Sequence, residues 1–271
     1  MNLYKTERRL DILIIFLYLR IHLVMKYISV KEPRAQVAEL VDALDSGSSK
    51  RKFVEVRVFF WAPLSGGYMD IRLYQGDLPD AVAFGKVVAI DTETMGLNTH
   101  RDRLCLVQMT FGDGVIHLVQ FQNRTYHAPN LQRLLADPGI LKIFHFGRFD
   151  IAMLYAHLGV LTQNVYCTKI ASRLVRTFTD RHGLKELCRE LLGVDISKTE
   201  QRSDWGASTL TPEQLKYAAG DVLYLHQLRD QFNIVLEREG RRDLAQKCFD
   251  FLPTRALLDH VGWPEQDIFA Y

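Results

Sequence analysis

A short apolar run, residues 87–90 with the sequence VVAI, ends in two carboxylates at Asp91 and Glu93. The run is rich in β-branched residues and has the length of a buried strand, so we expect a strand over residues 86–93. Residues i and i+2 of a strand lie on the same face, and open α/β sheets usually bind ligands at the carboxyl ends of their strands. Asp91 and Glu93 would repel each other there unless a cation lay between them. They are therefore a candidate metal site, with solvated acids at an exposed strand end as the alternative.

The other predicted elements place this strand in a sheet of mixed direction. A turn sequence, Gly112-Asp113-Gly114, separates two further strand-like runs and predicts a hairpin. Strands that alternate with helices after a hairpin indicate an α/β fold with a mixed rather than a parallel sheet. The expected strands besides the first cover residues 104–111, 115–119 and 140–145, and the expected helices cover residues 130–136, 147–158, 168–176, 184–192 and 211–239.

Composition limits the class of protein. Hydrophobic residues make up 48% of the 271 residues, which is enough for a sizeable core in one large or two small domains. The four cysteines form no C-x-x-C pair, which argues against a zinc site or a disulfide framework and predicts a cytoplasmic location. The net charge of +2 gives no hint of a nucleic-acid partner, because residues 1–68 carry the whole basic excess.

The segment before the candidate site has two unusual stretches. Residues 11–30 are apolar, but Arg20, His22 and Lys26 interrupt them, so they lack the ~18 uncharged residues of a membrane-spanning helix. No small-residue cleavage site follows, and no membrane role is expected. Residues 35–63, AQVAELVDALDSGSSKRKFVEVRVFFWAP, resemble a leucine transfer-RNA gene translated as protein.

A third acid lies in the stretch FHFGRFDIAMLYAHL. Asp150 shares a helical face with Met153 and Leu154, and a carboxylate in such an apolar stripe is unexpected. One explanation is a functional acid. The alternative is a favourable interaction with the positive end of the helix dipole.

A fourth acid lies in TLTPEQLKYAAGDVLYLHQL. Thr211 and Gln214 have the spacing of a capping box, and Pro212 occupies the first helical position, so the start of this helix is well specified. Tyr217 and Asp221 are four residues apart and share one face of the helix. The alternative is a solvent-exposed flank, which would leave these two residues far from the other acids.

The order and spacing of these residues resemble the DEDD family of 3′-to-5′ exonucleases in its tyrosine subclass. The stretches VAIDTETMGLN, KIFHFGRFD, HGLKELCRELLGVDISKTEQRSDW and LKYAAGDVLYL resemble ribonuclease D in particular, over about residues 69–240. The resemblance implies a ribonuclease H-like α/β fold with a single nuclease domain. It also implies a hydrolase that removes nucleotides from the 3′ end of a nucleic acid, with RNA processing favoured.

The family's chemistry implies a role for each residue. Two divalent ions, Mg²⁺ or Mn²⁺, about 3.5–4 Å apart can supply the nucleophile and cover the charge on the departing oxygen. By the resemblance, Asp91 bridges both ions, Glu93 and Asp221 complete the first site, and Asp150 holds the second, partly through water. Tyr217 is implied to hydrogen-bond the attacking water.

Substrate contacts are expected beside these acids. By the resemblance, Lys198 and Arg202 contact backbone phosphates. Trp205 either stacks on a base or lies buried in support of the site. Thr94 and Met95 are candidates for contacts with the terminal nucleotide, although ribonuclease D often has an aromatic residue where this chain has Thr94.

Two resemblances divide the chain into three parts. The transfer-RNA-like stretch makes residues 1–68 a dubious extension from an upstream start, with Met69 as the natural start. The apolar residues of this extension should share no core with the body; a genuine amphipathic extension is the alternative. Residues 69–245 form the exonuclease domain. Residues 246–271 form a tail, without the further helical nucleic-acid-binding domains that ribonuclease D usually carries.

Two other functions stay open at this point. The chain could act on the 3′ end of DNA, or it could be a nuclease-fold binding module that has lost activity. The complete set of four acids and Tyr217 argues against the second. The expected partner is the 3′ end of a nucleic acid, and neither a membrane nor a required protein partner is inferred.

Overall fold

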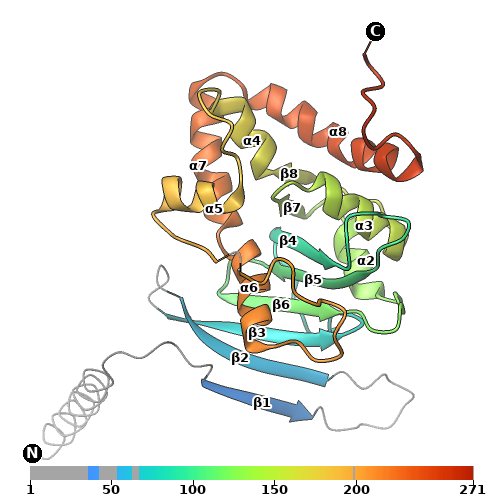
Figure 1. The fold of residues 1–271 in the computed structure, drawn as a ribbon. Coiled ribbons are helices and arrows are strands. Elements are labelled where there is room, and N and C mark those ends of the chain that lie inside the picture. The colour runs from blue at the N-terminus through green and yellow to red at the C-terminus, as the bar shows by residue number, and fades with distance from the viewer. Residues whose placement is uncertain (1–35, 43–53, 63–66, 198, 271) are drawn as a thin grey trace, which may run out of the picture. The chain divides into compact units, whose positions relative to one another are not determined.

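The computed structural model describes residues 36–42, 54–62, 67–197 and 199–270, which belong to one compact unit (Figure 1). Within them an eight-stranded sheet has the order β1-β2-β3-β6-β5-β4-β7-β8. The strands are β1 (Gln36–Asp42), β2 (Val54–Ala62), β3 (Gly67–Gln75), β4 (Val87–Thr94), β5 (Leu104–Thr110), β6 (Val115–Gln120), β7 (Leu141–Phe144) and β8 (Val165–Cys167).

The sheet is mixed, as predicted. β4 pairs antiparallel with β5 and β5 antiparallel with β6, whereas β4-β7, β7-β8 and β3-β6 are parallel pairs. All seven residues of β5 are buried, so this strand lies in the core of the sheet. The predicted hairpin at Gly112–Gly114 is confirmed, and both glycines have positive φ angles, which glycine adopts without strain.

Helices cover the sheet and pack on one another. They are α2 (Pro129–Ala136), α3 (Arg148–Leu158), α4 (Thr168–Val175), α5 (Leu184–Leu187), α6 (Pro212–Leu223), α7 (Leu225–Arg238) and α8 (Arg242–Val261), with a π-helical turn η1 (Cys188–Leu192). α6 packs across β4, β5 and β6, and α3 packs on β4 and β5. These two helices therefore bring their side chains to the strand that carries the first two acids.

Several helix predictions differ from the structure. The predicted helix over residues 211–239 ends at Leu223 and restarts at Leu225, because Tyr224 turns the chain between α6 and α7. The predicted helix over residues 184–192 becomes the single turn α5 followed by η1, which ends at the left-handed Gly193. The expected boundary at residue 245 falls inside α8, which packs on α3 and β8.

The strands before Met69 bear on the expected division of the chain. β2 pairs with β3 over seven residues, and Val58 is 4% exposed within the hydrophobic core. The expectation that residues 1–68 share no core with the body is wrong at Val58. That Met69 is the natural start stays a prediction. The apolar stretch over residues 11–30 lies outside the described residues. Within the described ranges, no helix is long and apolar enough to span a membrane.

Candidate metal-binding active site

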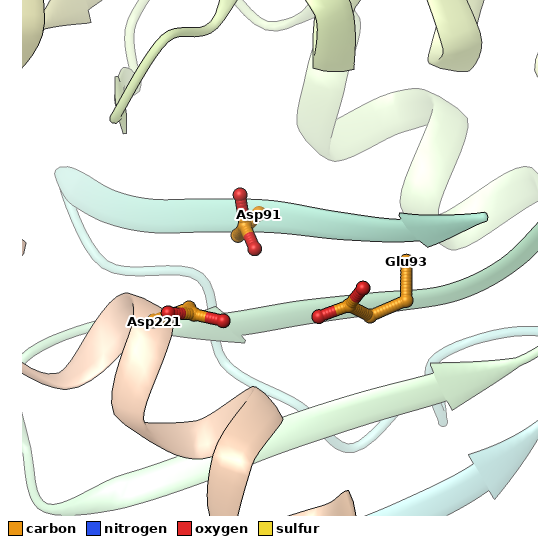
Figure 2. A group of neighbouring side chains, drawn as sticks. All are labelled: Asp91, Glu93 and Asp221. Atoms are coloured by element: carbon orange, nitrogen blue, oxygen red, sulfur yellow. The ribbon is translucent and has the colours of Figure 1, made fainter. Parts of the chain in front are cut away.

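Three of the four predicted acids meet at one point. Oxygen atoms of Asp91, Glu93 and Asp221, one from each carboxylate, lie within 4.8 Å of one another. Figure 2 shows Asp91 and Glu93 on β4 and Asp221 on the facing turn of α6. Residues 130 positions apart in the sequence thus form one carboxylate cluster, and the alternative of an exposed flank at Asp221 does not hold.

Local structure explains why the cluster forms. Asp91 pairs with Gln108 of β5, and the Gln108 amide donates a 2.9 Å hydrogen bond to an Asp91 oxygen. A register shift in the pairing of β4 with β5 follows Glu93, at the end of the strand. On the other side, the capping box is present as predicted: Thr211 accepts from the Gln214 backbone N–H, and the Gln214 side chain accepts from the Thr211 N–H. This fixed start sets where α6 presents Asp221.

The cluster has the electrostatics of a cation site. Burial raises the pKa of Asp91 well above its usual range, and the charges of Asp150, Asp221 and Glu93 raise it further. Burial likewise raises the pKa of Glu93, followed by the charges of Asp221 and Asp150. Hard carboxylate oxygens are the ligands that Mg²⁺ prefers. A divalent cation therefore fits this donor set, because it would offset both the repulsion and the burial cost.

Asp150 lies beside this cluster in the first turn of α3. The hydroxyl of Thr92 donates a 2.6 Å hydrogen bond to one Asp150 oxygen. Burial raises the pKa of Asp150 to about 7, although the Thr92 hydrogen bond opposes the shift. Asp150 contributes no oxygen to the three-residue group, but its charge acts on both Asp91 and Glu93.

Tyr217 lies on the same face of α6 as Asp221. Burial is the main cause that raises the pKa of its phenol, and the charge of Asp221 adds to it, so the hydroxyl keeps its proton at neutral pH. The centres of the Tyr217 and Trp205 rings lie 5.9 Å apart. Tyr217 is therefore a neutral hydroxyl next to the carboxylates, able to donate one hydrogen bond and accept another.

A cavity of about 940 Å³ joins the predicted residues. Its lining includes every described residue of the predicted site, namely Asp91, Glu93, Thr94, Met95, Asp150, Arg202, Trp205, Tyr217 and Asp221. Lys198 lies outside the described residues. Trp205 is only 2% exposed, so its indole supports the wall of the cavity, whereas Met95 is 49% exposed at its rim.

Sequence reasoning missed several residues in or beside this cavity. Thr92 donates a hydrogen bond to Asp150, and Gln108 donates one to Asp91. Gln108 could have been identified from the sequence because it is a polar residue in a fully buried strand. Phe146 lies at the rim with a positive φ of 67°, and the Lys169 ammonium lies 3.9 Å from the centre of its ring. His145 also lines the cavity, and its ring forms a 2.9 Å hydrogen bond with the Thr168 hydroxyl.

Comparison with known proteins gives a consistent family. A 3′-5′ exonuclease family model matches residues 77–237. Ribonuclease D of Granulibacter bethesdensis is 36% identical over 154 residues, which are 57% of this chain and 38% of that protein. DNA polymerase I of Aquifex aeolicus is 35% identical over 179 residues, 63% of this chain and 29% of that protein.

Solved structures show the same likeness. Brucella melitensis NrnC bound to pGG is 56% identical, with a TM-score of 0.72 over 74% of this chain and 98% of that one. NrnC with bound Mg²⁺ is 55% identical with a TM-score of 0.71. The match spans only 38% of the curated ribonuclease D, less than half of its length. The predicted ribonuclease H-like fold is confirmed, and the chain belongs to the 3′-5′ exonuclease family.

Proposed function

We propose that this chain is a metal-dependent exonuclease that removes nucleotides from the 3′ end of RNA. The observation that carries the proposal is the convergence of Asp91, Glu93 and Asp221 oxygens within 4.8 Å, in a cavity that also holds Asp150 and Tyr217. Membership of the exonuclease family and the likeness to ribonuclease D support the reaction and favour RNA. The four cysteines are free thiols, which suits a reducing compartment such as the cytoplasm.

The acids provide for two divalent ions. Asp91, Glu93 and Asp221 would hold the first, and Asp91 and Asp150 would hold the second. NrnC with bound Mg²⁺ supports the choice of a hard divalent ion. Bound divalent ions lower the pKa of water and neutralise charge on the phosphate. Thr92 and Gln108 fix the Asp150 and Asp91 carboxylates before substrate arrives, so little reorganisation is needed.

The remaining residues orient the substrate and the water. The neutral Tyr217 hydroxyl hydrogen-bonds the attacking water and aligns it with the scissile phosphate. Arg202 is exposed on the cavity wall and offers charge and hydrogen-bond donors to a backbone phosphate. Lys198 is proposed for a second phosphate, and Thr94 and Met95 for the terminal nucleotide. Trp205 keeps Tyr217 in place rather than stacking on a base.

DNA is the second candidate substrate. DNA polymerase I of Aquifex aeolicus matches this chain at 35% identity, so the exonuclease domain also resembles one found in a DNA-acting protein. Both substrates present the same phosphodiester to the carboxylates, and only contacts with the 2′-hydroxyl distinguish them at a given site.

The test is a degradation assay on matched substrates. RNA and DNA of the same sequence, labelled at the 5′ end, are incubated with Mg²⁺, with Mn²⁺ or with EDTA, and pGG is assayed alongside as a short substrate. We expect a ladder that shortens from the 3′ end, runs faster on RNA and stops in EDTA. Faster degradation of DNA would favour the second candidate. Release of the 5′ label as a mononucleotide from the long substrates before any shortened intermediate appears, or no cleavage with either metal, would contradict the proposal.

A further inference from the structure

The start of α3 carries Asp150, yet no side chain among the described residues caps this helix. The turn before it is tight: a Cβ atom at Gly147 would lie 2.6 Å from the Phe144 Cβ, and Phe146 has a left-handed backbone. Thr92 restrains only the Asp150 carboxylate itself. Contacts on the far side of α3 therefore also bear on where its first turn lies.

A partly buried ion pair lies on the far side of α3. Arg148, the first residue of α3, forms a two-pronged contact with Asp259 of α8, with its Nη2 atom 2.7 Å from Asp259 Oδ1. Asp259 also accepts a 2.6 Å hydrogen bond from Arg255. Two-pronged arginine–carboxylate pairs fix geometry as well as charge. The Asp259 side chain is 12% exposed and that of Arg148 is 35% exposed, so the contact is shielded from solvent on the Asp259 side only.

The C-terminal end of α8 makes further contacts. Arg148 and Arg255 both donate to the Pro264 carbonyl, and Arg255 donates to the Trp263 carbonyl at 2.6 Å. The ring of His260 stacks on His100, in the loop that follows β4, with 4.5 Å between ring centres. α8 packs closely along α3 (Figure 1). The end of α8 therefore contacts both the helix that carries Asp150 and the loop after the strand that carries Asp91.

We infer that Asp259 is a positioning residue for the metal site and acts through Arg148 on Asp150. This inference rests on the proposed function. Arg148 and Asp150 are two residues apart, so they point to different sides of α3, one toward α8 and the other into the cavity. Without the Asp259 carboxylate, Arg148 and Arg255 would face each other as like charges. The first turn of α3 would then shift away from α8, and Asp150 would move with it.

The readout is metal binding rather than activity alone. We compare the full-length Asp259→Asn variant with the wild type by calorimetric titration of Mn²⁺ into the metal-free protein, without substrate. Partners outside the ligand shell typically change metal affinity by about 10–100-fold, and we expect weakening in that range. The Mg²⁺ concentration for half-maximal rate on RNA should rise by the same factor, while the KM for RNA at saturating Mg²⁺ stays unchanged.

A matched control lies on the same helix. Asp250 is exposed on α8 and accepts a hydrogen bond from Gln246, so Asp250→Asn makes the same chemical change without touching α3 and should bind Mn²⁺ like the wild type. Asp259→Glu keeps the charge and should recover part of the affinity. If Asp259→Asn fails to fold, Arg148→Lys replaces the two-pronged contact by a single charge and should weaken Mn²⁺ binding by a smaller factor.

Wild-type Mn²⁺ affinity in a folded Asp259→Asn or Arg148→Lys variant would overturn the inference. A lower melting temperature with unchanged metal affinity would also overturn it, because it would assign Asp259 a structural role only. If the wild type shows no metal-dependent hydrolysis, the proposed function fails instead. The two failures are therefore separable in one set of measurements.

Discussion

Two regions of the sheet differ in what folding buries. Around β4 and α3, folding buries Asp91, Glu93 and Asp150, and the pKa of each is raised because its charged form is unfavourable there. Near the β1 edge of the sheet, β2 joins β3 through backbone pairing, and Val58 adds an apolar side chain to the core. The first region opposes folding through its charges, and the second contributes to it.

This difference separates stability from activity. Sites that concentrate like charges lower the stability of the fold, and replacing such groups commonly stabilises a protein while function is lost. Substitutions in the carboxylate cluster should therefore abolish activity without unfolding the chain. Changes near β2 should reduce stability without changing catalysis.

Asp221→Asn should have the largest effect. It removes a proposed metal ligand from the three-carboxylate group, and metal stabilisation of the transition state is worth several kcal/mol, so we expect hydrolysis to fall by about 10³-fold or more. The metal-free variant should melt at the same or a higher temperature, since Asp221 is one of the charges that raise the pKa of Asp91 and Glu93. Turnover on RNA and thermal melting check both parts.

The control for this variant is Asp230→Asn. Asp230 lies on α7 with a side chain that is 60% exposed, and it pairs with the neighbouring Arg229. This variant should keep wild-type turnover. An Asp221→Asn protein that stays active and melts normally would remove Asp221 from the metal site.

Tyr217→Phe should slow the reaction by about 10²-fold, the lower end of the range for a general acid–base contact. The phenylalanine ring keeps the contact with Trp205, so the fold and the Mn²⁺ affinity should not change. Single-turnover rates on RNA, with calorimetric Mn²⁺ titration as the control, test this. An unchanged single-turnover rate would show that the hydroxyl does not orient the water.

Much of this site could be predicted because its residues follow local rules. The i, i+2 alternation of a strand places Asp91 with Glu93, and the i, i+4 spacing of a helix places Tyr217 with Asp221. The capping box at Thr211 fixes the start of α6 from four residues alone. The strand that carries Asp91 and the helix that carries Asp221 are far apart in the sequence, and only the family resemblance indicated that they meet.

The parts that were missed depend on contacts distant in sequence. Thr92 reaches Asp150 across 58 positions, and Arg148 reaches Asp259 across 111, so no local pattern marks either pair. The break at Tyr224 lies inside a continuous apolar stripe, so periodicity alone predicts one helix there. Val58 enters the core because β2 pairs with β3, which its transfer-RNA-like sequence gave no reason to expect.

At the carboxylate cluster, a rise in pH should lower the stability of the metal-free protein, whereas a bound divalent ion should raise stability. The folded pKa of Asp150 is about 7, whereas an unfolded aspartate titrates near 3.9. Between about pH 4 and 7 the metal-free folded protein therefore binds more protons than the unfolded chain, and this group's contribution to stability falls as pH rises. A divalent ion at about 100 times its Kd adds about 2.7 kcal/mol, or about 5–10 °C in Tm.

The measurement is the Tm difference with and without Mg²⁺ at pH 5 and pH 8, which should be larger at pH 8, where the carboxylates are charged. Half-buried histidines with lowered pKa, such as His157 and His226, shift stability in the opposite direction. The same titration on Asp150→Asn cancels their effect and isolates the carboxylate. A Mg²⁺ effect of equal size at both pH values would contradict the prediction.

The smallest effect is expected at the far end of the sheet. A chain that begins at Met69 lacks β1 and β2, but β3 keeps its parallel pairing with β6 from Asp70 to Gln75. Among the described residues, the lining of the cavity begins at Asp91, so turnover and Mn²⁺ affinity should equal those of the long chain. Burial of a valine is worth about 1.5–3 kcal/mol, which sets the upper limit of the stability lost with Val58.

Expression of both chains, with turnover on one RNA substrate and thermal melting, tests this end of the contrast. With about 2–4 °C per kcal/mol for a domain of this size, the Met69 chain should melt a few degrees lower, and the Val58→Ala variant of the long chain should show part of that loss. A Met69 chain that melts at or above the long form would mean that residues 1–68 contribute nothing net, as expected of a translated transfer-RNA gene. A Met69 chain that folds but loses turnover would contradict the separation of stability from activity, because β1 and β2 would then affect the active site.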